Sequence, residues 1–166
     1  MLFAISLYDV SVFVHVSAVV VGFGATFALA LAFPLAVNLH PQHLPFVHRL
    51  SLAINQRFAG PALLLILLTG IYQTIDGDWG FGKAWISGTF LIVLILGGLN
   101  GGYFVPTDRK LEAMATRELS AAGPGGEPAK LSDEYQRLAQ REGGIGAVAG
   151  FLVIVAVFLM VTKPGA

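Results

Sequence analysis

The sequence predicts an all-α membrane protein, an antiparallel four-transmembrane-helix bundle, and three observations lead to this fold class. Of its 166 residues, 55% are hydrophobic and only 12% are charged, with a mean hydropathy of +0.75, whereas soluble domains carry about 25% charged residues. Four long stretches contain no Asp, Glu, Lys or Arg. Runs within them such as ALLLILL and FLIVLILGG lack the alternation that a membrane β-barrel requires.

The four uncharged stretches define the expected spans of a single membrane domain, residues 1–166. A helix needs about 17–25 residues to cross roughly 30 Å of hydrocarbon, and the spans cover about residues 10–37, 58–75, 84–106 and 143–162. The first span is expected to be retained, because MLFAISLYD has no basic residue and carries Asp9 where a signal peptide would be positively charged.

The basic residues predict the orientation. With four crossings, the connections between spans one and two and between spans three and four share one side of the membrane. That side holds eight of the ten Lys and Arg residues, and the other side holds Lys83 and Lys163. The positive-inside rule therefore places the first side in the cytoplasm, with the N-terminus and the C-terminus outside.

The two cytoplasmic connections differ in character. In the first, Pro41 and Pro45 break the chain, and a mildly amphipathic helix is expected to follow, enter the membrane near Arg57 and bend at Pro61. The second covers about residues 107–142 and is charged throughout. Its GPGGEP segment at residues 123–128 is expected to divide it into two short helical stretches.

Composition also excludes several functions. The chain has no cysteine, so disulfides and thiolate metal sites are absent. The formal net charge is zero and no basic surface is clustered, so no nucleic-acid partner is expected and the lipid bilayer is the main one. No acidic residue lies within a span, which disfavours a proton-coupled carrier.

His15 is the leading candidate for a functional residue. It lies within SVFVHVSAVVVGFG on a stripe of otherwise small residues, Ser11, Ala18, Gly22 and Ala25. Small residues let transmembrane helices approach closely, so His15 is expected to face the bundle interior and to need a polar partner. Three explanations compete: a hydrogen bond that joins two helices, an axial ligand to haem b iron, and a proton or metal site on a transport path.

Other polar residues supply possible partners. Thr69 and Gln73 lie at the expected level of His15 and are candidate hydrogen-bond partners. Arg57, at the mouth of the second span, is expected to meet lipid phosphate or to hold an anionic group such as a haem propionate. His40 and His43 are three residues apart, a spacing that can bind Zn²⁺ or Cu²⁺ with further ligands.

The cytoplasmic histidines include His48 and are interpreted mainly as interfacial loop residues. They lie at the opposite membrane face from His15, which disfavours a bis-histidine haem within one chain. Glycine pairs four apart, Gly97 with Gly101 and Gly98 with Gly102, indicate tight helix packing. The protein is therefore expected to form a homo-oligomer or to bind other membrane proteins.

The segments FVHVSAVVVGFG and RFAGPALLLILLTGIY resemble the small four-span bacterial predicted integral membrane proteins known as domain of unknown function 2269. The chain is more distantly similar to copper-resistance D proteins and to the membrane protoporphyrinogen oxidase family. These resemblances imply a bacterial plasma (inner) membrane location and associate the position of His15 with haem. The leading hypothesis is a haem-binding or redox-related accessory protein. The alternatives are a non-catalytic structural or interaction subunit and a copper-handling membrane protein.

Overall fold

The computed structural model describes residues 5–39, 41–121 and 131–165, and it contains helices and no strand within them. The α-helices are α1 (Leu7–Leu39), α2 (Leu44–Ile54), α3 (Gly60–Asp76), α4 (Ala84–Leu99), α5 (Val105–Ala121) and α6 (Asp133–Thr162). A 3₁₀ turn, η1 (Pro41–His43), precedes α2, and two π-helical segments, η2 (Asn55–Ala59) and η3 (Asn100–Phe104), join α2 to α3 and α4 to α5.

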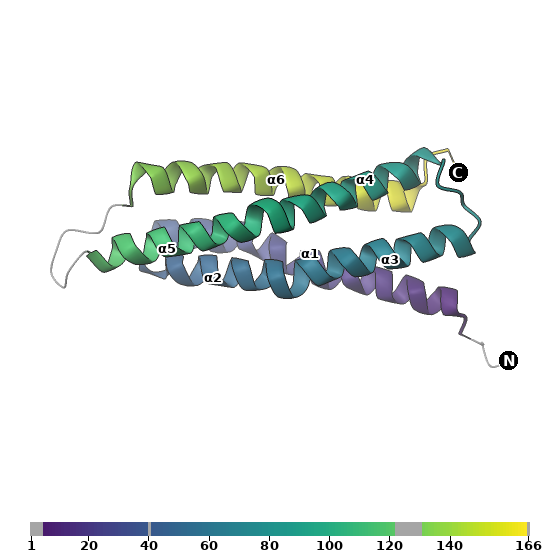
Figure 1. The fold of residues 1–166 in the computed structure, drawn as a ribbon, viewed down its shortest axis with the longest axis horizontal. Coiled ribbons are helices and arrows are strands. Elements are labelled where there is room, and N and C mark those ends of the chain that lie inside the picture. Colours follow the sequence, from purple (N-terminus) through teal and green to yellow (C-terminus); the bar gives the residue numbers. More distant parts are fainter. Residues whose placement is uncertain (1–4, 40, 122–130, 166) are drawn as a thin grey trace.

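These elements form four long rods that run antiparallel (Figure 1). α1 packs mainly against α3, and α4 packs mainly against α6. All four rods are long and apolar enough to cross a membrane, which confirms the predicted fold class. At 1.5 Å per residue, the 33 residues of α1 extend about 50 Å, so the rods are longer than the ~30 Å hydrocarbon layer.

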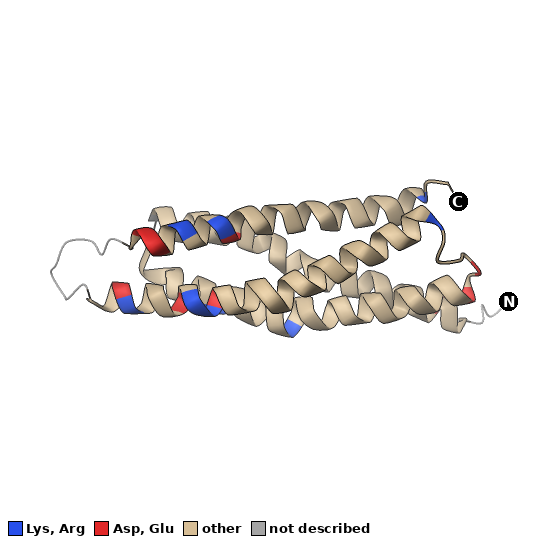
Figure 2. Ribbon diagram, turned by 45° about the horizontal axis from the view of Figure 1, so that its top comes forward, with Lys and Arg blue, Asp and Glu red and all other residues tan. Residues whose placement is uncertain are grey.

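The extra length lies at one end of the bundle. Figure 2 shows that most charged residues lie at the end of the bundle where α2, α5 and the start of α6 are found. Helical structure continues into the connection expected over residues 107–142, because α5 runs to Ala121 and α6 begins at Asp133. The two helical stretches expected there are thus the ends of membrane helices. The GPGGEP segment itself lies outside the described residues.

The two π-helical segments share a sequence pattern. In each, an asparagine stands six residues before a proline: Asn55 before Pro61, and Asn100 before Pro106. Proline has no N–H and its ring displaces the carbonyl four residues earlier, so a normal α-turn cannot pass through it unchanged. Instead the chain makes i→i−5 bonds, from the Gly60 N–H to the Asn55 carbonyl and from the Val105 N–H to the Asn100 carbonyl. Both rods therefore remain continuous through a proline.

Two apolar cores lie along the bundle and leave a polar layer between them. The first core fills the membrane half (Ala18, Ala62, Leu63, Ile66, Ile92, Val93, Leu96, Ala149 and Val153). The second fills the charged end (Ala36, Leu44, Val47, Leu111, Ala115 and Tyr135). Between them, in sequence and in space, α2, α5 and α6 bring buried polar side chains together.

Candidate functional site

Three ionisable residues from three helices meet in the polar layer. His48 comes from α2, Asp108 from α5 and Glu142 from α6. His48 and Asp108 are 1% and 0% exposed, and Glu142 is half-buried. Buried charged groups are rare unless they are paired or bind a metal, so this cluster is the candidate functional site.

The His48 imidazole is oriented by its neighbours. Its Nε2 lies 2.7 Å from the Tyr135 hydroxyl, and Tyr135 is itself 3% exposed. The two rings meet edge to face, and the Phe33 ring lies 4.9 Å from the imidazole on another side. With Nε2 engaged, the remaining nitrogen, Nδ1, points toward Asp108, whose Oδ1 is 3.7 Å away.

The Asp108 carboxylate is fixed in the same manner. Its Oδ2 accepts hydrogen bonds from the Ser51 hydroxyl at 2.9 Å and from the Asn55 amide at 3.0 Å. Asn55 belongs to η2, and its carbonyl oxygen accepts a 3.4 Å bond from the Asn100 amide in η3. The two π-helical segments are therefore joined to each other and to the carboxylate.

One buried atom of each ionisable residue forms no hydrogen bond. These atoms are His48 Nδ1, Asp108 Oδ1 and Glu142 Oε1, and none has a hydrogen-bond partner among the described residues. One ligand atom from each of the three residues lies within 4.8 Å of the others. Two ligands about 2.1 Å from a shared ion are ~3.4 Å apart, so a small contraction would let all three contact one cation.

The charge of the cluster also favours a cation. Among the described residues, the Lys and Arg ion pairs join Arg49 to Glu112 and Lys110 to Glu134, and neither pair includes Asp108 or Glu142. Two carboxylates that are close and shielded from water repel each other, and separating either from water costs several kcal/mol without compensation. A bound cation would offset both effects.

None of these three residues was expected to form a site. The expectation that His48 is an interfacial loop residue is wrong, because η1 ends at His43, and α2 with the start of η2 buries the face that carries His48, Ser51 and Asn55. The recurrence of these polar residues at three- and four-residue spacing was a usable signal. Asp108 and Glu142 stand just outside the uncharged spans, within the charged connection of residues 107–142, and were not among the expected site residues.

His15 has a protein partner at the opposite half of the bundle. Its Nδ1 lies 2.8 Å from the Thr69 hydroxyl, a contact between α1 and α3. Gln73 forms no hydrogen bond with His15 among the described residues; it donates to the Ser11 carbonyl oxygen and hydroxyl at 3.2 and 3.1 Å. A Cβ added at Gly70 would lie 3.6 Å from the imidazole, so the α3 backbone closes one side of the ring.

The other expected site residues lie apart from His15. Arg57 is exposed on η2. It precedes Thr69 by twelve residues, or about 18 Å of helix, so the structure does not bring Arg57 and His15 into one site. His43 is exposed in η1, and His40 lies outside the described residues.

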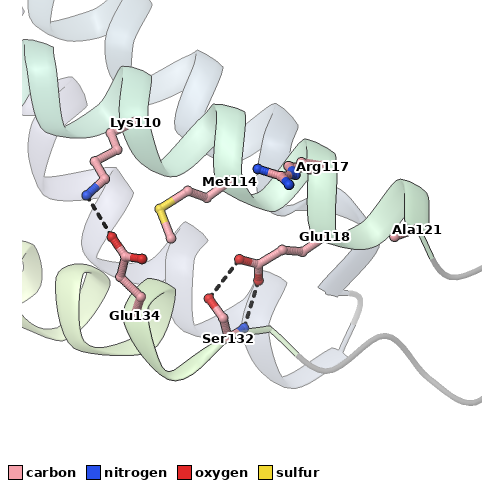
Figure 3. A pocket seen from close by; sticks show the side chains of 7 residues that line it. All are labelled: Lys110, Met114, Arg117, Glu118, Ala121, Ser132 and Glu134. Atoms are coloured by element: carbon pink, nitrogen blue, oxygen red, sulfur yellow. Dashed lines mark hydrogen bonds and ion pairs between the residues drawn. The ribbon is translucent and has the colours of Figure 1, made fainter.

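Two hollows in the described part of the chain add little to the candidate functional site. One is a cavity of about 50 Å³ between the membrane helices, far below the 300 Å³ or more of ordinary ligand pockets. His15 is not among its lining residues. The other is an open depression of about 590 Å³ at the charged end (Figure 3), where Lys110 pairs with Glu134 and Glu118 accepts two bonds from Ser132. Most of its polar groups are therefore already paired.

Several glycines of the third span have open space beside them in the part of the chain that the structure describes. A Cβ added at Gly97, Gly98, Gly101 or Gly102 would meet nothing within 4 Å. By contrast, a Cβ at Gly22 would overlap the Cβ of Ala62, where α1 crosses α3 closely. The close approach expected for the first-span stripe is thus seen at Gly22. The glycines of the third span face away from the other described helices.

Comparison with known proteins gives one match. Residues 9–164 match the family described as predicted integral membrane protein (DUF2269). No curated protein and no solved structure shows significant similarity to the chain. The more distant similarity to copper-resistance D and protoporphyrinogen oxidase proteins stays a prediction. The match covers nearly the whole length and agrees with four apolar rods, so this chain is a multi-span integral membrane protein that belongs to the DUF2269 family.

Proposed function

We propose that this protein is a membrane-anchored binder of a divalent metal ion, with His48, Asp108 and Glu142 as the protein ligands. The observation that carries the proposal is the convergence of three buried ligand atoms that have no other partner. The surrounding hydrogen bonds support it. Metal-binding imidazoles and carboxylates are normally held through their other polar atom, as Tyr135 holds His48 and Ser51 holds Asp108.

The donor atoms indicate the class of metal. One imidazole nitrogen and two carboxylate oxygens suit borderline and hard divalent ions such as Zn²⁺, Fe²⁺ and Mn²⁺. Soft Cu⁺ prefers thiolate and thioether ligands, and the chain has no cysteine. The charge asymmetry of the sequence supports an orientation with this end of the bundle in the cytoplasm, and in that orientation the ion would come from the cytoplasm.

The haem proposal for His15 has weaker support. An axial ligand commonly binds a hydrogen-bond partner through its second nitrogen, and Thr69 could serve in that way. However, Arg57 is distant and the nearby α3 backbone covers one side of the ring. The geometry favours His15 as a residue that joins α1 to α3. An absorption spectrum before and after dithionite tests haem: a Soret band that His15→Ala abolishes would establish it.

The metal proposal is tested by Co²⁺ titration of the intact protein. The protein is purified in mild detergent, stripped with EDTA and titrated while the visible d–d absorption of Co²⁺ is recorded. We expect saturation at one ion per chain and displacement by Zn²⁺. Glu142→Gln preserves the size of the side chain and removes the ligand charge. Loss of a residue that only hydrogen-bonds to a ligand typically weakens metal binding by up to about 100-fold, so loss of a ligand should weaken Co²⁺ binding by about 100-fold or more.

Glu134→Gln is the matched control, because Glu134 lies on the same helix but is exposed and paired with Lys110. It should bind Co²⁺ as the wild type does. Circular dichroism verifies that both variants are folded. The proposal is overturned if the wild type shows no saturable spectrum, or if Glu142→Gln and Glu134→Gln bind Co²⁺ equally well.

A further inference from the structure

A second cluster, at the opposite end of the bundle from the metal site, brings two lysines and two tryptophans together. The Lys163 ammonium lies 4.3 Å from the centre of the Trp79 ring, and the Lys83 ammonium lies 5.5 Å from the same centre. Trp79 and Trp85 pack edge to face at 5.7 Å. The four residues come from the α3–α4 connection, the start of α4 and the end of α6.

The two ammonium groups have no acidic partner. Neither Lys83 nor Lys163 forms an ion pair with a carboxylate of the described chain, and both side chains are half-buried. Two like charges close to one aromatic ring repel each other, and each contact with the ring stabilises only its own ammonium. An anion between them would remove the repulsion.

The start of α4 adds further positive potential. Lys83 is the N-cap residue of this 16-residue helix, and no side chain caps the helix. N-cap positions favour Ser, Thr, Asp and Asn, whose oxygens accept bonds from the first N–H groups. A lysine there adds charge to the positive end of the helix dipole, the reverse of the stabilising arrangement. This helix start is therefore suited to an external anion.

Trp85 provides a second and independent indication. Its side chain is 4% exposed, and its indole N–H has no acceptor among the described residues. It is the second residue of α4, and its ring lies 5.7 Å from the Lys163 ammonium. A buried indole donor normally has an acceptor, so the cluster lacks one oxygen ligand.

We propose that this cluster binds the phosphate group of an anionic phospholipid at the membrane surface, through Lys83, Lys163, the Trp85 indole and the start of α4. The flanking side chains support a lipid source for the phosphate. The cluster borders the apolar spans, and aromatic residues concentrate at the depth of lipid headgroups. An acyl chain could then lie along the exposed apolar side chains of α6, such as Phe158 and Val161.

Intrinsic fluorescence tests this proposal directly, because Trp79 and Trp85 are the two tryptophans of the chain. Protein in detergent micelles is titrated with short-chain phosphatidylglycerol, with short-chain phosphatidylcholine and with inorganic phosphate. We expect a saturable change with phosphatidylglycerol at a far lower concentration than with the other two. The double variant Lys83→Gln with Lys163→Gln should weaken binding about 25-fold, since each lysine near a membrane surface contributes about fivefold.

Lys110→Gln is the matched control, because Lys110 pairs with Glu134 at the other end of the bundle and should not affect the titration. If the double variant fails to fold, Lys163→Gln alone and titration at raised salt replace it, and both should weaken binding. Equal responses to phosphatidylglycerol and phosphatidylcholine would show that the cluster makes only an apolar contact with lipid, and would overturn the proposal. An equal or stronger response to inorganic phosphate would overturn the lipid assignment.

Discussion

The contact of Gly22 with Ala62 allows a quantitative test of how α1 and α3 are held together. A Cβ added at Gly22 would overlap the Ala62 Cβ, so Gly22→Ala must push the two helices apart. Overpacking of this kind costs about 1–3 kcal/mol of unfolding free energy. The substitution also gains about 1 kcal/mol of helix propensity. The net loss is therefore ~0–2 kcal/mol.

Gly24→Ala isolates the packing cost. A Cβ at Gly24 would meet nothing within 4 Å, so this variant gains the same propensity without a clash. Gly22→Ala should therefore be about 1–3 kcal/mol less stable than Gly24→Ala. The swap Gly22→Ala with Ala62→Gly returns one methyl group to the contact. It should recover at least ~1 kcal/mol relative to the sum of the two single variants.

The assay is reversible unfolding by SDS in detergent micelles, followed by far-UV circular dichroism. The single variants, the double variant and the Gly24→Ala control are measured under one condition, so that differences in free energy are compared. If Gly22→Ala is as stable as Gly24→Ala, or if the double variant shows no recovery, α1 and α3 do not meet at this contact. The reasoning about the first-span stripe would then be refuted.

Three further outcomes are expected. His15→Ala and Thr69→Val should each lower the unfolding free energy, measured by SDS unfolding, by about 0.6 kcal/mol, because each removes the same interhelical hydrogen bond. The double variant should lose no more than the larger single loss, and additive losses would contradict this bond. Tyr135→Phe removes the hydroxyl beside His48 Nε2 and should weaken Co²⁺ binding about 10–100-fold, as measured by visible titration. An unchanged affinity would show that Tyr135 does not support a metal ligand. Arg49→Gln breaks an exposed ion pair with Glu112 and should change the unfolding free energy by less than about 1 kcal/mol, so a larger loss would reveal a role beyond the pair.

The cluster of His48, Asp108 and Glu142 could not be predicted from the sequence alone. Charge-free runs of sufficient length identify spans because lipid cannot satisfy backbone polar groups, and this argument needs no tertiary information. The same reasoning treats charged residues beyond a span as solvated. At Asp108 and Glu142 that assumption failed, since α5 and α6 continue past the span and pack together with α2.

The effect of the two prolines, Pro61 and Pro106, was likewise only partly predictable from the sequence. Pro61 was expected to bend the second span, and Pro106 marked the end of the third. The structure accommodates both with a π-helical turn that begins at Asn55 or Asn100. Asn55 donates a hydrogen bond to the buried Asp108, and Asn100 donates one to the Asn55 carbonyl oxygen. The backbone effect of the prolines is therefore connected to the site only through the packing of the helices.

By itself the sequence determined the four membrane helices, their expected orientation and the first-span stripe of small residues, because each depends on composition and periodicity along one segment. The tertiary structure alone decided that His48, Asp108 and Glu142 meet, that His15 reaches Thr69, and that the glycines of the third span face away from the other described helices. Those outcomes depend on the rotation of each helix about its axis relative to its neighbours. That rotation is set by the packing of side chains distant in sequence, which no local pattern encodes.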